Sequence, residues 1–285
     1  MLNIVNARRA VVKVGTSTIT YENGRPNLQR IERLVRVLSD FRSRGIDVAL
    51  VTSGAISVGL SKLGLEKRPE EMAKKQAAAA VGQCELMFLY DRLFNEYGHT
   101  AAQVLLTRDV VDTDQKRENV LSTLDALFSM GVIPVVNEND TVSTDEIDHR
   151  GVFGDNDTLS AIVASIIRAD ILILLSDIDG LYDKDPAVNA DAKLIPVVYA
   201  IDDELRNVGG GAGTDRGTGG MATKIAAAEL ATENGVCMVI ANGEDPDILR
   251  DIMDGRIRGT VFLPRKHRDA RNRPAAPVRS SGHTV

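Results

Sequence analysis

Two lysines in unusual positions are the first sign of chemistry in this sequence. Lys13 interrupts the apolar run 9–14 and is followed by the turn Gly15-Thr16-Ser17. A lysine in a short buried strand costs free energy unless it is paired or meets an anion. Lys224 lies in the first turn of a predicted helix, directly after a glycine-rich segment. Free N–H groups and the helix dipole favour an anion there, so both lysines indicate a ligand such as a phosphate group.

A crowded polar cluster, Gly154-Asp155-Asn156-Asp157-Thr158, precedes the apolar helical pattern 159–167. Asp157 can cap this helix through the N–H two or three residues on. One cap leaves Asp155 and Asn156 unexplained, and we therefore interpret the cluster as a candidate site. Asp157 is placed to hold both lysines in position, whereas Asp155 has no assigned role.

Each of these features also has a structural interpretation. Lys13 could lie on an edge strand and face solvent, and the glycine-rich segment could be a surface loop. The segment before Lys224 lacks the G-x-x-x-x-G-K-[ST] spacing and is not a P-loop.

Strand and helix patterns alternate along the chain. Runs such as 48–51 and 171–175 are apolar on both faces, which is typical of parallel strands covered on each side. The alternation predicts an α/β fold, a three-layer αβα sandwich around a mainly parallel open sheet. We predict strands at 9–14, 48–51, 101–106, 132–136, 171–175, 194–199, 236–241 and 260–263, and helices at 28–44, within 69–97, and at 114–130, 157–167, 221–234 and 245–253.

Further polar residues follow predicted strands, where ligands bind in such sheets. Ser53 is followed by small residues that allow close approach to a carboxylate. Asn137, Asn139 and Asp140 form a set suited to an α-amino group, and Ser176-Asp177 could meet a nucleotide. Considered alone, each of these residues more often lies in a turn or caps a helix. Together they predict one site at one edge of the sheet.

Composition and charge argue against several classes of protein. The 285 residues are 44% hydrophobic and 26% charged, as in ordinary globular proteins, and a net charge of -6 argues against a general nucleic-acid surface. We expect no membrane span and no secretory signal. Cys84 and Cys237 are isolated in apolar surroundings, which favours a reducing, cytoplasmic setting. Residues 265–285, rich in Arg, Pro and Ser, are predicted to be a disordered tail.

Taken together, these motifs resemble the glutamate 5-kinases of the amino acid kinase superfamily. The matching stretches follow family order between residues 8 and 264: Val12-Lys13-Val14-Gly15-Thr16-Ser17, Val51-Thr52-Ser53-Gly54-Ala55-Ile56, Asn137-Glu138-Asn139-Asp140, Gly154-Asp155-Asn156-Asp157, Leu175-Ser176-Asp177 with Gly180-Leu181-Tyr182, and Gly217-Thr218-Gly219-Gly220-Met221-Ala222-Thr223-Lys224.

The resemblance implies ATP-dependent phosphorylation of the γ-carboxylate of L-glutamate to L-glutamyl 5-phosphate, the first step of proline biosynthesis. It further implies Mg²⁺, feedback inhibition by proline, a homo-oligomer (dimer or tetramer), and no nucleic-acid or membrane partner. Residues 1–264 would form the kinase domain, in a short form without the C-terminal PUA domain of many family members.

The resemblance also implies residue roles. Lys13, Lys224 and Asp157 would be catalytic, and Ser53, Asn137, Asp140 and Asn156 would bind glutamate. No protein side chain is implied as a metal ligand. ATP would be bound by Lys13, Gly15, Ser176, Asp177, Thr218, Gly219, Gly220, Met221, Ala222, Thr223 and Lys224.

Two alternatives stay open. The first is another kinase of the superfamily, acting on N-acetylglutamate, aspartate, carbamate or UMP. The second is a non-catalytic regulator that binds an amino acid. The Gly-Thr-Ser turn and the Asn-Glu-Asn-Asp run favour free glutamate, and the joint presence of Lys13, Lys224 and Asp157 argues against a regulator. A carboxylate acceptor is ionised at neutral pH, so the absence of a catalytic histidine is no objection.

Overall fold

A computed structural model describes residues 3–65, 67–142, 156–186, 188–208 and 220–264. In these residues an eight-stranded sheet has the order β3-β4-β2-β1-β5-β7-β8-β6. The strands are β1 Arg9–Val14, β2 Asp47–Val51, β3 Ala101–Leu106, β4 Ile133–Glu138, β5 Ile171–Ser176, β6 Val197–Val198, β7 Cys237–Asn242 and β8 Thr260–Phe262.

The α-helices are α1 Thr16–Ile19, α2 Leu28–Ser43, α3 Ala55–Lys62, α4 Met72–Glu96, α5 Asp114–Ser129, α6 Asn156–Ile166, α7 Asp203–Val208, α8 Met221–Glu233 and α9 Ile248–Met253. Short 3₁₀ helices span Asn3–Asn6 and Arg108–Val111. Asn27 caps α2 as expected, because its side chain accepts a hydrogen bond from the Arg30 N–H.

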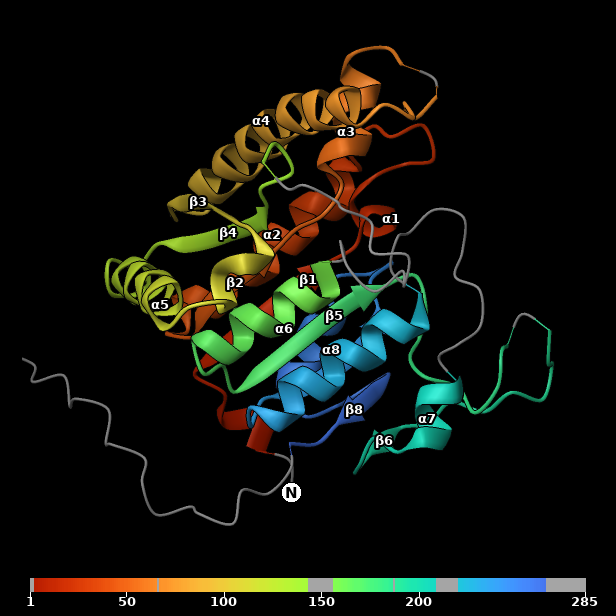
Figure 1. Ribbon diagram of the computed structural model, residues 1–285. Coiled ribbons are helices and arrows are strands. Elements are labelled where there is room, and N and C mark those ends of the chain that lie inside the picture. Colours follow the sequence, from red (N-terminus) through yellow and green to blue (C-terminus); the bar gives the residue numbers. More distant parts are fainter. Residues whose placement is uncertain (1–2, 66, 143–155, 187, 209–219, 265–285) are drawn as a thin grey trace, which may run out of the picture.

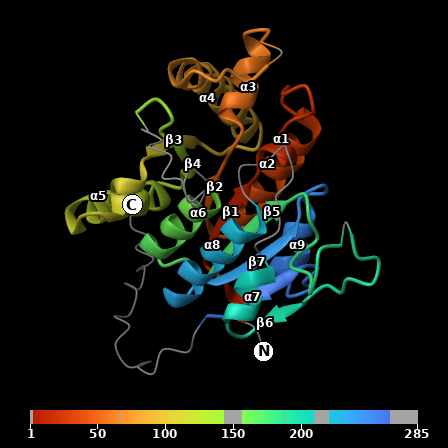
Figure 2. The same ribbon diagram turned by 45° about the vertical axis from the view of Figure 1, so that its right-hand side comes forward.

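The sheet separates two apolar cores. Alternate strand residues pack against α2, α4 and α9 on one face, and the intervening residues pack against α5, α6 and α8 on the other. Figure 1 looks onto the second face, where α6 and α8 lie in front of the sheet, and Figure 2 shows α9 on the other side of β7 from α8. The predicted three-layer α/β sandwich is therefore confirmed.

All strand pairs are parallel except β7 with β8. The carboxyl ends of β4, β2, β1, β5 and β7 consequently meet at one edge of the sheet. β1 lies between β2 and β5, in the middle of the sheet. The interpretation of Lys13 as an edge-strand lysine facing solvent is therefore wrong.

Several predicted boundaries need correction. Asn137 and Glu138 are the last residues of β4 rather than a loop after it. The run 194–199 contains only the two-residue strand β6 and an isolated bridge from Leu194 to Tyr182. Helix α9 begins at Ile248, later than predicted, and α1, α3 and α7 were not predicted; α1 includes Thr16 and Ser17 of the predicted turn. Cys84 is exposed rather than enclosed by apolar residues, whereas Cys237 is buried.

The helices α3 and α4 touch through their backbones, as their adjacent ribbons at the top of Figure 1 illustrate. A Cβ built on Gly59 would lie 1.8 Å from the Ala78 carbonyl oxygen, and one on Gly82 would lie 1.8 Å from the Ala55 carbonyl oxygen. Both contacts are with backbone atoms that cannot rotate away. Glycine is required at each position because any side chain would separate the helices.

Gly82→Ala is expected to lower the free energy of unfolding by about 3 kcal/mol or more, the upper range for overpacking, because two helix backbones must move apart. Urea unfolding followed by circular dichroism measures the loss. Gly45→Ala is the control: Gly45 has a φ of 84° and open space for a Cβ, so only backbone strain of about 1 kcal/mol is expected. Equal losses in the two variants would contradict the close-contact explanation.

Two of the expectations fall on residues that the structure does not describe. The predicted tail 265–285 lies outside the described residues, and so does Asp155. Among the helices that the structure describes, none combines the length and the apolar character that a membrane span requires.

Candidate active site

The two lysines and Asp157 meet above the middle of the sheet. Lys13 Nζ lies 2.5 Å from Asp157 Oδ1, and Lys224 Nζ lies 3.2 Å from Asp157 Oδ2. Asp157 is 0% exposed and each lysine is 6% exposed. Thr223 donates a hydrogen bond of 3.3 Å to Asp157 Oδ2. One carboxylate between two ammonium groups leaves a formal charge of +1 in a nearly dry environment, which favours an anion.

The three charged side chains come from three elements, β1, α6 and α8. Lys13 shares a face of β1 with Val11, the face that α6 and α8 cover. Asp157 is in the first turn of α6, and Lys224 is in the first turn of α8. The helix starts therefore point their free N–H groups toward the same region as the lysines. The Asp157 oxygens face the lysine pair, which gives this acid a purpose beyond helix capping.

The residues predicted to bind a nucleotide lie on the β5 side of the lysines. The Gly15 N–H donates to the Leu175 carbonyl at 3.4 Å, and a Cβ on Gly15 would lie 3.8 Å from Lys13 Nζ. Ser176 Oγ donates to Asp177 Oδ1 at 3.1 Å. Gly220 is the N-cap of α8, which continues through Met221, Ala222 and Thr223 to Lys224. Thr218 and Gly219 lie outside the described residues.

Three of the predicted glutamate-binding residues meet on the β2 and β4 side. Asn156 Nδ2 lies within hydrogen-bonding distance of three oxygens: Thr52 O at 2.8 Å, Ser53 Oγ at 2.9 Å and Asn137 Oδ1 at 3.0 Å. Asn156 and Asp157 are consecutive residues of α6, so this polar group adjoins the lysine pair directly.

Asp140, the fourth predicted glutamate-binding residue, lines a cavity of about 400 Å³ between α4 and the ends of β3 and β4. Gln83, Gln103 and Asn139 also line it. The cavity has the size of a small-molecule site. Gln83 connects this cavity to the polar group of Ser53, Asn137 and Asn156, since Asn137 Nδ2 donates to Gln83 Oε1 at 2.7 Å.

Helix α4 contributes two residues that the sequence analysis missed, Gln83 and Tyr90. Tyr90 is fully buried, its hydroxyl lies 2.9 Å from Thr52 Oγ1, and burial raises the pKa of Tyr90 to about 12. A glutamine and a tyrosine in an alanine-rich helix give no spacing signal, although a polar residue on a predicted buried face could have prompted a search for its partner.

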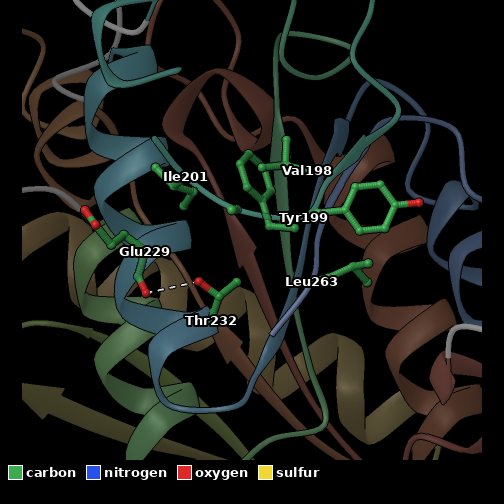
Figure 3. A pocket seen from close by; sticks show the side chains of 8 residues that line it. Val198, Tyr199, Ile201, Glu229, Thr232 and Leu263 are labelled. Carbon is green, nitrogen blue, oxygen red and sulfur yellow. Dashed lines mark hydrogen bonds between the residues drawn. The ribbon is translucent and has the colours of Figure 1, made fainter. Parts of the chain in front are cut away.

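A second cavity, drawn in Figure 3, lies between α8 and the strands β6 and β8. Val198, Ile201, Thr232 and Leu263 are among its lining side chains. Its volume is about 10 Å³, room for roughly one water molecule. It is too small for a substrate, and we place the candidate site at the lysine pair and the polar group beside it.

Comparison with known proteins bears on this site. Residues 8–242 match the model of the amino acid kinase family. The chain is 56% identical to a glutamate 5-kinase of Clostridium perfringens (strain 13 / Type A) over 92% of this chain and 97% of that protein. It is 51% identical to one of Lactococcus lactis subsp. lactis (strain IL1403), over 91% and 96%. A longer relative, from Thermoanaerobacter sp. (strain X514), is 52% identical over 90% of this chain and 68% of its own length.

Solved structures agree on the fold. A crystal structure of T. acidophilum isopentenyl phosphate kinase in a product complex superposes with a TM-score of 0.61 at 20% identity, over 89% of this chain and 99% of that one. UMP kinase from Ureaplasma parvum gives 0.60 at 14% identity, over 90% and 98%. The family match and the near-complete coverage of close relatives lead to one conclusion: the chain belongs to the amino acid kinase family and, within it, to the glutamate 5-kinases.

Proposed function

We propose that this protein transfers the γ-phosphoryl group of ATP to the γ-carboxylate of L-glutamate, giving L-glutamyl 5-phosphate and ADP. The observation that carries the proposal is the buried Lys13–Asp157–Lys224 arrangement directly beside the polar group of Ser53, Asn137 and Asn156. Cations for a phosphoryl group and amides for an amino acid thus adjoin each other.

The reaction joins two anions. A γ-carboxylate oxygen attacks the γ-phosphorus, and the bond from that phosphorus to the bridging oxygen of ADP breaks. The carboxylate is already ionised, so no proton has to be removed. Lys13 and Lys224 neutralise charge on the transferring group, and Asp157 holds both lysines in place. Gly15, Ser176, Asp177 and the segment 218–224 would bind ATP around them.

The acceptor would be held by the polar group and Asp140. Ser53 Oγ accepts from Asn156 Nδ2, so its own hydrogen is available for a substrate carboxylate. Asp140, at the wall of the 400 Å³ cavity, supplies a negative charge for the α-ammonium group. Asn137 fixes the position of Asn156 through the 3.0 Å hydrogen bond between them.

Mg²⁺ would accompany the nucleotide. The described residues contain no group of three His, Cys, Asp or Glu side chains suited to a metal ion. We expect the ion to be held mainly by the phosphate oxygens of ATP, which is the usual mode for Mg²⁺. When bound, the ion would screen phosphate charge.

Further parts of the proposal concern the setting of the enzyme. We place the reaction first in proline biosynthesis, in the cytoplasm, with proline as feedback inhibitor and a homo-oligomer as the working form. Residues 1–264 would act as one kinase domain and 265–285 as a tail. The family membership supports these assignments, and the net charge of -6 agrees with the absence of a nucleic-acid partner.

A hydroxylamine trap tests the acceptor. With ATP, Mg²⁺, hydroxylamine and separate amino acids, we expect hydroxamate from L-glutamate, because an acyl phosphate reacts with hydroxylamine. Aspartate, N-acetylglutamate and glutarate serve as comparison acceptors. Hydroxamate from aspartate or N-acetylglutamate without any from glutamate would contradict the proposed function and favour another member of the superfamily. No hydroxamate from any acceptor would favour the non-catalytic regulator.

A further inference from the structure

Three amide side chains, those of Gln83, Asn137 and Asn156, are linked one to the next by hydrogen bonds. Asn137 Nδ2 donates to Gln83 Oε1 at 2.7 Å, and Asn156 Nδ2 donates to Asn137 Oδ1 at 3.0 Å. They come from α4, β4 and α6, which are far apart in sequence. We call Gln83, Asn137 and Asn156 the amide chain.

Backbone groups fix the direction of the amide chain. The Glu138 N–H, which can only donate, lies 2.9 Å from one end of the Asn137 amide, so that end must be Oδ1. The Thr52 carbonyl, which can only accept, lies 2.8 Å from one end of the Asn156 amide, so that end must be Nδ2. The Asn137 atom that faces Gln83 is therefore Nδ2, a donor, so the Gln83 atom that it contacts must be the acceptor Oε1.

One polar atom at each end of the amide chain takes no part in its hydrogen bonds. Asn156 Oδ1 and Gln83 Nε2 are buried, and neither has a hydrogen-bond partner among the residues that the structure describes. A buried polar atom without a partner is costly, so such atoms in a site point to a ligand. Asn156 Oδ1 can only accept. At neutral pH the α-ammonium is the one hydrogen-bond donor of glutamate, because both carboxylates are ionised.

We propose that Gln83 is a positioning residue of the glutamate site, which sets the amide chain so that Asn156 Oδ1 receives the substrate α-ammonium. This inference rests on the proposed function. Gln83 is 8% exposed and lines the same cavity as Asp140. Its oxygen satisfies Asn137 Nδ2. Without that oxygen, Asn137 Nδ2 would lack an acceptor, and rotation of the Asn137 amide toward other partners would lower its free energy. Asn156 would then lose its hydrogen bond to Asn137 Oδ1.

The fold holds Gln83 rigidly. Gly82, the preceding residue, is the point at which α4 touches α3. Helix α3 begins at Ala55, just after Ser53, which is itself hydrogen-bonded to Asn156. The glycine contact thus sets the distance between the helix that carries Gln83 and the loop that carries Ser53.

Gln83→Met tests the role, because methionine keeps the length of the side chain and removes both amide atoms. We expect the KM for glutamate to rise roughly ten-fold, the usual effect of leaving a buried donor unpaired. The KM for ATP should stay within about two-fold, and kcat should fall less than the KM rises. The inhibition constant of glutarate, which has both carboxylates and no ammonium, should stay within about two-fold of the wild-type value.

Two further variants make the test specific. In Gln83→Glu, burial favours the neutral acid, whose carbonyl still accepts from Asn137, so the KM for glutamate should stay within about three-fold of wild type. Gln115→Met is the matched control, because it makes the same substitution on the exposed face of α5, where the Gln115 amide donates to Asn119 Oδ1 at 3.0 Å, and it should leave the KM for glutamate unchanged. Gln83→Leu replaces Gln83→Met if the latter does not fold.

The outcomes are separable. Hydroxamate production from glutamate by the wild type tests the proposed function, whatever Gln83 does. With an active wild type, the inference is overturned if Gln83→Met leaves the KM for glutamate unchanged. It is also overturned if the binding of glutamate and that of glutarate weaken equally, or if Gln115→Met has the same effect as Gln83→Met.

Discussion

Asp157→Asn is expected to lower kcat by roughly a thousand-fold while the KM for glutamate changes little. The substitution removes the carboxylate that lies between Lys13 and Lys224, so the two buried ammonium groups repel each other more strongly. They would move apart or lose a proton, and the cationic site for the phosphoryl group would be lost. The glutamate side depends on Asn156, whose amide nitrogen lies within hydrogen-bonding distance of Thr52, Ser53 and Asn137, and these contacts do not involve Asp157.

Hydroxamate formation at saturating ATP and glutamate measures the effect, with circular dichroism to check folding. Asp170→Asn is the matched control. Asp170 Oδ2 accepts from the Arg8 and Arg9 N–H groups, at the amino end of the sheet far from the site. That variant should lose stability and keep kcat. A kcat for Asp157→Asn within three-fold of wild type would show that Asp157 has no part in phosphoryl transfer.

Lys13→Ala and Lys224→Ala are each expected to lower kcat by roughly a hundred-fold or more, with a much smaller change in glutamate affinity. Each lysine would act on charge that develops during transfer, and neither contacts the amides that hold the amino acid. The two variants should also be more stable than Asp157→Asn. Removing one lysine leaves the ion pair between Asp157 and the other lysine, whereas removing the carboxylate breaks both ion pairs, and breaking a buried pair costs about 3–5 kcal/mol.

Steady-state kinetics with glutamate and ATP varied separately, together with thermal melts, test both statements. Lys116→Ala is the control, because Lys116 forms an exposed ion pair with Asp109 and should affect neither parameter. Loss confined to glutamate affinity would mean that the lysine pair binds the amino acid rather than the phosphoryl group.

Much of the architecture follows from local patterns. The limits of β1 and β3 match the predicted runs, because buried parallel strands are marked by apolar residues bounded by turns. Helix α3 was missed for a physical reason. It follows Gly54, whose φ is 91°, and it contains Gly59, so its local propensity is poor. Contact with α4, which no local pattern encodes, stabilises it.

The site was predictable to the extent that buried charge demands a partner. Lys13 in an apolar strand and Asp157 at the start of a buried helix each required an explanation, and the structure brings these two residues together. Gln83 gave no such signal. Its partner Asn137 is 54 positions away, and an uncharged amide in a helix is unremarkable until the fold shows which atoms it meets.

The central place of β1 has a consequence for synthesis of the chain. β1 is translated first, and its partner β2 follows soon, but its other neighbour, β5, begins only at Ile171. Until then one edge of an apolar strand stays open to other nascent chains. Charged residues, lysine above all, are what natural proteins use to discourage pairing at such edges. We therefore expect the Lys13 charge to discourage such pairing before β5 is made, and in the folded protein the same charge lies buried against Asp157.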